Sequence, residues 1–158
     1  MTAEIFKSDW PAALGKVPSG LFIVTTPDTG FLASWVQQCG FKPPQITIAV
    51  ANDRPVLQTL TDGAPLGLNV LPEGSKALIG HFGKGFAPGE AAFEGLDVEA
   101  IDGQAVKLNA AMAWLELRVA SRHVAGDHTL VIATVVAGEV VKPEQKPTIH
   151  TRRDAARY

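Results

Sequence analysis

The stretch that decides the fold is residues 30–50, GFLASWVQQCGFKPPQITIAV. Residues 31–38 and residues 45–51 are both rich in the side chains that β-strands favour. The double proline at 43–44 separates the two runs, and because proline cannot donate a hydrogen bond to a strand ladder, the chain must turn a corner there. The stretch therefore predicts two strands with a corner between them.

The middle of this stretch is unusually polar. Ser34, Trp35, Gln37, Gln38 and Cys39 interrupt the hydrophobic pattern just before the proline corner. Trp35 taken alone is typical of a core or interface, and Cys39 is expected to be a small buried apolar side chain. A core does not need a tryptophan flanked by polar side chains, however, so the alternative interpretation is a bound ligand.

Short strand-like runs with turn signals between them continue on both sides. They predict a mainly β fold, a closed or nearly closed β-barrel with short peripheral helices. The expected strands are residues 20–26, 31–38, 45–51, 66–71, 113–122 and 130–137, with one or two short strands in 97–108. The expected helices are residues 8–15, 54–62 and 75–82, and residues 83–89 form a glycine and proline loop.

Two of the later strands differ in their hydrophobic pattern. Residues 113–122 alternate, with Leu115 and Leu117 on one face and Trp114 and Glu116 on the other, as in a half-buried antiparallel strand. Residues 130–137 are apolar almost throughout, so both faces of that strand should be covered. A second copy of the chain would supply the cover, and a homodimer is therefore expected.

Composition narrows the function classes. The chain has 158 residues, 46% hydrophobic and 19% charged, and a net charge of −2. Residues 1–158 are interpreted as one domain, because a chain of this length can bury its own core. The small net charge supplies no general electrostatic field that would attract nucleic acid. No apolar run is long enough for a membrane span or a signal peptide, so a cytoplasmic protein is expected. The single cysteine and the histidine spacing match no disulfide or zinc pattern.

The one basic run lies at the end of the sequence and consists of Arg152, Arg153 and Arg157. It is interpreted as a solvated tail, and the alternative is a clasp on an anion or on a second subunit.

Several polar residues suit an anionic ligand. Ser34, Asn52, Arg54 and Lys84 offer the hydroxyl, amide and cationic groups that a phosphate ester needs, although each alone has an ordinary surface role. There is no activated nucleophile and no paired carboxylate site, so an enzyme of this kind would take its chemistry from a cofactor. On local chemistry alone, residues 126–128 (Gly-Asp-His) form a hairpin turn with an incidental histidine.

Taken in order, these segments resemble the flavin reductase-like, FMN-binding split-barrel family, and most closely the C-terminal flavin reductase domain of cyanobacterial flavodiiron proteins. The resemblance covers residues 12–158. It is carried by residues 14–25, 32–38, 43–44, 68–71, 81–86, 113–116 and 126–128, and by Tyr158.

The resemblance implies a site for each group of polar residues. Residues that border the flavin ring and ribityl chain are Ala33, Ser34, Trp35, Val36 and Gln38. Residues toward the phosphate and the remaining cofactor contacts are Asn52, Arg54, Gly83, Lys84 and Asp127. His128 is implied as the catalytic residue, beside the nicotinamide and the flavin. The implied cofactor is FMN, with FAD as the alternative, and NADH or NADPH is the co-substrate.

The function implied is an FMN-containing flavin reductase that transfers hydride from NAD(P)H to flavin. Electrons would then pass to free flavin, oxygen or a partner protein. The alternative is a flavin-bearing electron carrier without NAD(P)H turnover, and a pyridoxamine-phosphate oxidase relative is a weaker one. The sequence departs from the family pattern in two places. Many stand-alone reductases of two-component monooxygenases have a Ser/Thr-rich run where this sequence has Trp35, Gln37 and Gln38. The 158 residues also contain no diiron or flavodoxin-like part.

Overall fold

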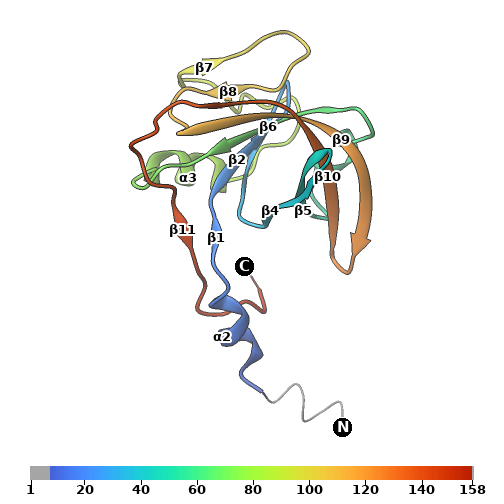
Figure 1. Cartoon of the computed structure of the whole chain (residues 1–158), viewed down its shortest axis with the longest axis vertical. Helices are drawn as coiled ribbons and strands as arrows, with labels where there is room; N and C mark the ends of the chain where they lie inside the picture. The colour runs from blue at the N-terminus through green and yellow to red at the C-terminus, as the bar shows by residue number, and fades with distance from the viewer. Residues whose placement is uncertain (1–7, 158) are drawn as a thin grey trace.

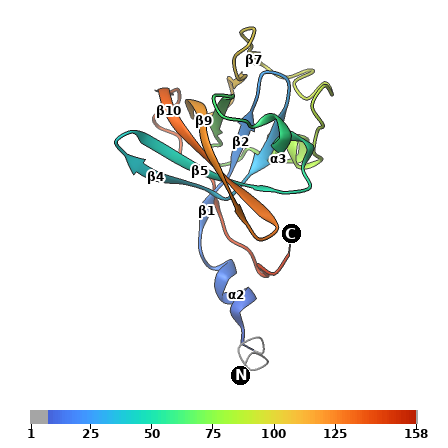
Figure 2. The same ribbon diagram turned by 90° about the vertical axis from the view of Figure 1, so that its right-hand side faces the viewer.

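The computed structural model describes residues 8–157, and its centre is a seven-stranded antiparallel sheet. In sequence order its strands are β2 (Phe22–Thr25), β3 (Gly30–Ala33), β4 (Val36–Phe41), β5 (Pro44–Ala51), β6 (Pro65–Val70), β9 (Ala113–Ala125) and β10 (His128–Val140). In space they follow the order β3-β2-β6-β9-β10-β5-β4. Figures 1 and 2 show the sheet coiled around itself, with the long β9–β10 hairpin on one side. The mainly β class predicted from the sequence is confirmed.

The helices are short and lie outside the sheet. They are α2 (Trp10–Gly15), the 3₁₀ turn η1 (Pro55–Thr59) and α3 (Lys76–Gly83). The helix expected at residues 54–62 is therefore wrong in type, because only the five residues of η1 turn, and they do so as a 3₁₀ helix. Asp9 is at the start of α2, but its side chain makes no capping hydrogen bond. Within residues 8–157 no helix has the length and apolar character that a membrane crossing requires.

The strand expected at residues 31–38 is two strands. Ala33 in β3 pairs with Phe22, whereas Val36 in β4 pairs with Ile48 on the other side of the sheet. β3 and β4 are the two ends of the strand order, so Ser34 and Trp35 carry the chain from one edge of the coiled sheet to the other. This dipeptide therefore lies where the two edges come together.

Two apolar clusters stabilise the sheet on its two faces. Alternate residues of one strand point to opposite faces, and in β2 the side chains of Ile23 and Val24 enter different clusters. The larger cluster fills the inside of the coiled sheet and includes Val24, Ile48, Leu66, Leu117 and Val131. The smaller one lies under α3 and includes Ile23, Leu71, Phe82 and Leu108.

Only one face of β10 is covered within the chain. Val131 and Ala133 are fully buried, but Ile132 is half-buried and Val136 is 55% exposed. One chain thus leaves the second face of residues 130–137 partly uncovered, and its cover by a second copy stays a prediction. An apolar surface is left along the second half of the strand.

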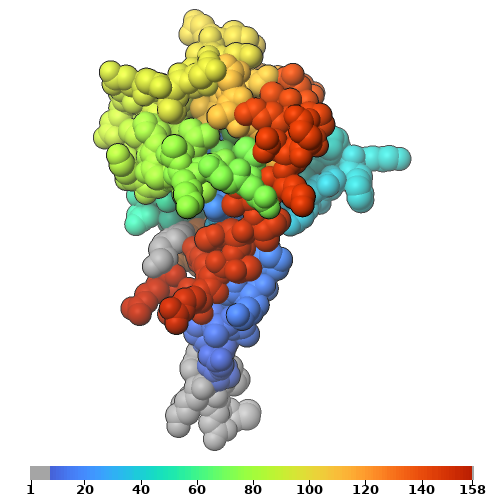
Figure 3. Space-filling view, turned by 90° about the vertical axis from the view of Figure 1, so that its left-hand side faces the viewer, coloured from blue at the N-terminus to red at the C-terminus, as the bar shows by residue number. Residues whose placement is uncertain are grey.

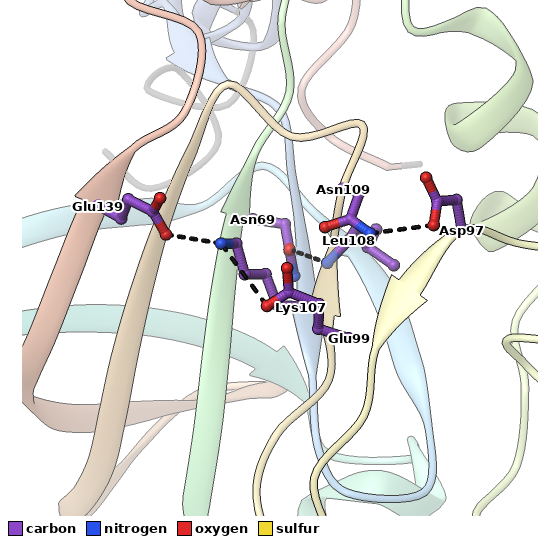
Figure 4. Close-up of polar contacts among 7 residues, drawn as sticks. All are labelled: Asn69, Asp97, Glu99, Lys107, Leu108, Asn109 and Glu139. Atoms are coloured by element: carbon purple, nitrogen blue, oxygen red, sulfur yellow. Dashed lines mark hydrogen bonds and ion pairs between the residues drawn. The ribbon is translucent and has the colours of Figure 1, made fainter.

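A polar network fixes the segment before β9 to the sheet (Figure 4). The Nδ2 of the fully buried Asn69 donates to the carbonyl of Ile23 at 3.0 Å, and its Oδ1 accepts from the Leu108 N–H at 2.8 Å. Leu108 belongs to the small strand β8 (Lys107–Leu108), which pairs with β7 (Val98–Glu99) as expected for residues 97–108. Lys107 Nζ lies 2.6 Å from Glu139 Oε2, and this hydrogen bond raises the pKa of Lys107.

Replacement of Asn69 by alanine is expected to destabilise the fold. The carbonyl of Ile23 and the N–H of Leu108 would lose their partner in the interior, at a cost on the order of 2–4 kcal/mol. Thermal unfolding should show a Tm lower by roughly 5–15 °C. The control is Asn109→Ala, which removes an exposed amide bonded to Asp97 and should change Tm little. Equal Tm values for the two variants would contradict this role of Asn69.

The two ends of the chain run side by side below the sheet (Figures 1 and 3). β1 (Ser19–Gly20) pairs with β11 (Ile149–His150), and beyond it the Arg152 N–H donates to the Gly15 carbonyl at 2.9 Å. A Cβ at Gly15 would collide with the carbonyl oxygen of Arg152, so this crossing requires glycine. The C-terminal segment (residues 149–157) is therefore docked on the N-terminal one.

Candidate functional site

Ser34 and Trp35 separate two hollows in the surface. On one side is a cavity of about 820 Å³ with mostly apolar walls, called here the apolar cavity. On the other is a narrow pocket of about 40 Å³. Ser34, Trp35 and Ala49 line both. The polar interruption noticed in the sequence is thus the partition between two neighbouring hollows.

A third hollow continues the row beyond the narrow pocket. This Arg54 cavity has a volume of about 370 Å³ and shares Phe31 and Arg54 with the narrow pocket. Lys84 and the loop after α3 form its opposite wall, and Asp53 also lines it. Arg54 and Lys84 contribute two positive charges and Asp53 one negative charge, so the described lining of this cavity is net positive. The Arg54 guanidinium lies 5.8 Å from the centre of the Phe31 ring.

Trp35 is in contact with two side chains from distant parts of the sequence. The ring of His128 lies 4.7 Å from its own, centre to centre, at an angle of 50°. The Arg152 guanidinium carbon lies 5.0 Å from the Trp35 ring, a distance at which a cation is attracted by the π-face. With 42% of its surface exposed, Trp35 still presents ring area to the cavities.

His128 is held in place by its neighbour in the chain. It is the first residue of β10 and only 8% exposed, and its Nδ1 lies 2.7 Å from Asp127 Oδ1. This hydrogen bond, followed by the charge of the imidazolium, lowers the pKa of the Asp127 carboxyl. Gly126 has a φ of 63°, which allows the tight turn before it. His128 is therefore anchored, but it does not line any of the three cavities as described and reaches them through Trp35.

Asn52 supports the same turn. Its Nδ2 donates to the Gly126 carbonyl at 3.1 Å, and its Oδ1 accepts from Thr129 Oγ1 at 2.6 Å. Its backbone N–H donates to the Asp127 carbonyl at 3.0 Å. Asn52 is not among the described residues that line the Arg54 cavity. Its contact with a phosphate stays a prediction, while its contacts with the turn are observed.

The remaining predicted residues lie along the row of cavities. Ala33 lines the narrow pocket, Val36 and Gln38 line the apolar cavity, and Gly83 and Lys84 line the Arg54 cavity. Ten of the eleven predicted site residues therefore gather around one row, either in its walls or, for Asp127 and His128, behind Trp35, and Asn52 is the exception. Cys39, expected to be buried, is exposed because β4 is an edge strand.

Sequence reasoning missed Arg152 and Phe31. The basic run at residues 152–157 was interpreted as solvated, which holds for the exposed Arg153 and Arg157 but is wrong for the half-buried Arg152. The alternative interpretation of this run, a clasp on an anion or a second subunit, was the signal that could have identified Arg152. Phe31 looked like an ordinary strand residue, and only the crossover after β3 brings it beside Arg54.

The arrangement suits two flat ligands with anionic groups. Arg54 and Lys84 lie in the cavity at one end of the row, and Arg152 lies in the wall of the apolar cavity beside Trp35, with aromatic and aliphatic surface around it. The two larger cavities have the volumes that small-molecule sites usually have. Ser19 and its strand partner His150 both line the apolar cavity, but the Ser19 hydroxyl donates to the Gly20 carbonyl at 3.1 Å. The described lining therefore suits binding and orientation of ligands.

Comparison with known proteins gives one family. The model of the flavin reductase like domain matches residues 14–157. A diflavin flavoprotein A from Nostoc is 40% identical over 156 residues, and one from Synechocystis is 38% identical over 151 residues. These alignments cover 96% and 92% of this chain but only 27% and 26% of the relatives, so the chain spans about a quarter of their length.

A solved structure shares the fold. The NADH:FAD oxidoreductase SgcE6 of Streptomyces globisporus superposes with a TM-score of 0.78 at 23% identity. The superposition covers 89% of this chain and 80% of that one.

Proposed function

The chain belongs to the flavin reductase-like domain family, and on that premise we propose that it is an FMN-containing oxidoreductase that accepts hydride from NADH or NADPH. The observation that carries the proposal is the position of Trp35. It stands between the narrow pocket, which Arg54 also lines, and the large apolar cavity, and it is packed against the anchored His128. Two aromatic ligands that enter from the two sides would meet at this residue.

The residues around Arg54 fit a flavin phosphate. A phosphate ester offers only acceptor oxygens and negative charge, which a guanidinium, an ammonium group and backbone N–H groups satisfy. Arg54 and Lys84 would supply the charges, and the glycine loop from Gly83 to Gly85 allows close approach of the backbone. The ring would lie along Ala33, Ser34, Trp35 and Val36. FAD would use the same contacts and extend farther into the Arg54 cavity.

A bound flavin supplies the hydride acceptor, so no side chain has to bond to the substrate. The protein contributes orientation: it holds two rings in contact and keeps water away from them, which can account for much of a rate enhancement. Trp35 would limit how the rings approach each other, and His128 with Asp127 would fix Trp35. Electrons would leave toward free flavin, oxygen or a partner protein.

The test of this function begins with the purified protein. We expect visible absorbance bands of a flavin, or binding of added FMN with quenching of its fluorescence, and oxidation of NADH or NADPH in the presence of that flavin. Titration with FMN, FAD and riboflavin ranks the three ligands. A protein that binds none of them would contradict the proposal.

We also propose that two chains assemble as a split-barrel homodimer. The support is the uncovered face of β10, where Val136 is 55% and Val140 66% exposed. Burial of such apolar area is favourable by about 25 cal/mol per Å². A second copy would cover it with the same surface under two-fold symmetry.

The dimer is tested by its mass in solution. Light scattering at micromolar concentration should give about twice the 16.7 kDa of one chain. Val136→Glu should shift the protein toward monomer, because a carboxylate would be buried in the contact. Ile101→Glu, at an exposed apolar position between β7 and β8, is the control and should leave the dimer intact. A wild-type monomer that still binds flavin would contradict the assembly.

A further inference from the structure

The apolar cavity carries one formal charge among the described residues that line it. Its walls come from strands of the seven-stranded sheet, from Ser34 and Trp35, and from residues of the segments 14–20 and 149–155. These walls are mostly aliphatic or aromatic. Arg152 is the only lysine, arginine, aspartate or glutamate in that lining. His150 is the only histidine in the described lining. An apolar cavity of about 820 Å³ with an arginine in its wall suits a ligand that is mostly flat and apolar but carries an anionic group.

Arg152 is held in this place by the backbone around it. Its N–H donates to the Gly15 carbonyl at 2.9 Å, and three residues later the Ala155 N–H donates to the Pro11 carbonyl at 3.1 Å. Ile149 and His150, just before it, pair with β1. Arg152 is half-buried, and its guanidinium lies 5.0 Å from the Trp35 ring. The backbone that carries Arg152 is therefore held in place, and its side chain extends to Trp35.

We propose that Arg152 binds a phosphate group of the nicotinamide donor and thereby seats the donor in the apolar cavity against Trp35, an inference that rests on the proposed function. A guanidinium matches phosphate oxygens with two parallel hydrogen bonds, and its planar face can stay on an aromatic ring while its edge donates. The two larger cavities then serve different ligands: Arg54 and Lys84 serve the flavin, and Arg152 serves the donor.

The phosphate has two sources in a nicotinamide dinucleotide. The pyrophosphate is present in both donors, whereas the ribose 2′-phosphate is present only in the NADPH series. If Arg152 binds the pyrophosphate, its loss weakens both series equally. If it binds the 2′-phosphate, its loss weakens only the second. Both results support an anion site at Arg152, and they differ in which donor the protein prefers.

The test is calorimetric titration of the flavin-loaded, oxidised protein with NAD⁺ and with NADP⁺. Arg152→Ala should weaken at least one of them by about tenfold or more, as expected for a lost charge-assisted hydrogen bond. Arg152→Lys should recover part of the affinity, because the charge returns without the planar fork. The matched control is Arg153→Ala, which removes the same charge from the adjacent, exposed position and should leave both affinities unchanged. Flavin affinity and Tm should be the same in all variants.

The outcomes separate this inference from the proposed function. Wild-type affinity for both nucleotides in Arg152→Ala, or an equal loss in Arg153→Ala, would overturn it, as would the absence of binding to the wild type. If Arg152→Ala loses its flavin, Arg152→Gln replaces it, since glutamine keeps most of the length without the charge. The titration requires no turnover. Nucleotide binding that depends on Arg152 in a protein that does not reduce flavin would refute the enzyme and keep this site.

Discussion

Flavin reduction by the nicotinamide donor is expected to slow by about a hundredfold in His128→Ala, with the flavin still bound. His128 packs against Trp35 and is anchored by Asp127, but it does not line the cavities as described, so its effect on the reacting rings is transmitted by Trp35. Loss of the imidazole would let the Trp35 ring move, and small displacements of one ring from the other have large effects on rate. The measurement is single-turnover reduction with each donor.

A second variant separates the ring from its hydrogen bond. His128→Phe keeps an aromatic side chain against Trp35 but cannot bond to Asp127. We expect it to recover much of the rate. Asp127, which is hydrogen-bonded to His128, and Arg152, which contacts the same Trp35 ring, both remain in the variant. His123→Ala, at an exposed position on β9, is the control. An unchanged rate in His128→Ala would leave His128 a residue of the turn.

Arg54→Ala is expected to weaken FMN by about 10- to 150-fold and riboflavin hardly at all. The loss of a charge-assisted hydrogen bond to a phosphate corresponds to roughly 1.5–3 kcal/mol in a partly desolvated site. Riboflavin has no phosphate, so it reports any general damage, including movement of Phe31 under the guanidinium. Lys84 is exposed, and Lys84→Ala should have a smaller effect of the same kind. Both affinities are measured by quenching of flavin fluorescence.

Equal losses of FMN and riboflavin in Arg54→Ala would contradict a phosphate contact and assign Arg54 to the fold. Arg153→Ala removes a charge from an exposed position outside the Arg54 cavity and should change neither affinity.

The sequence predicted the strands well where packing follows a simple alternation. Leu117 and Val119 are buried in β9 as their spacing indicates, and the proline corner lies at the β4–β5 turn. The prediction was wrong where tertiary contacts override the local pattern. No local signal shows that Ser34 and Trp35 cross between the two edges of a coiled sheet, because that crossing depends on the pairing of β3 and β4 with strands far apart in space.

The site was predicted in outline. Arg54 and Lys84 were chosen for their chemistry, and the structure brings them to one cavity although they are thirty residues apart. Asn52 was chosen on the same grounds, but its amide is bonded to Gly126 and Thr129, which a sequence cannot show. Arg152 was missed since its place depends on the crossing at Gly15, a contact between the two ends of the chain.

The most direct test of the account is anaerobic stopped-flow mixing of the flavin-loaded protein with NADH and NADPH. We expect at least one donor to bleach the flavin absorbance, with a rate that saturates with donor concentration and that deuterium at one of the two C4 positions of the donor slows. Saturation would reflect a seated donor, and the isotope effect would reflect direct hydride transfer between two oriented rings. Flavin that dithionite bleaches at once but neither donor reduces would contradict the account, and the protein would then be an electron carrier.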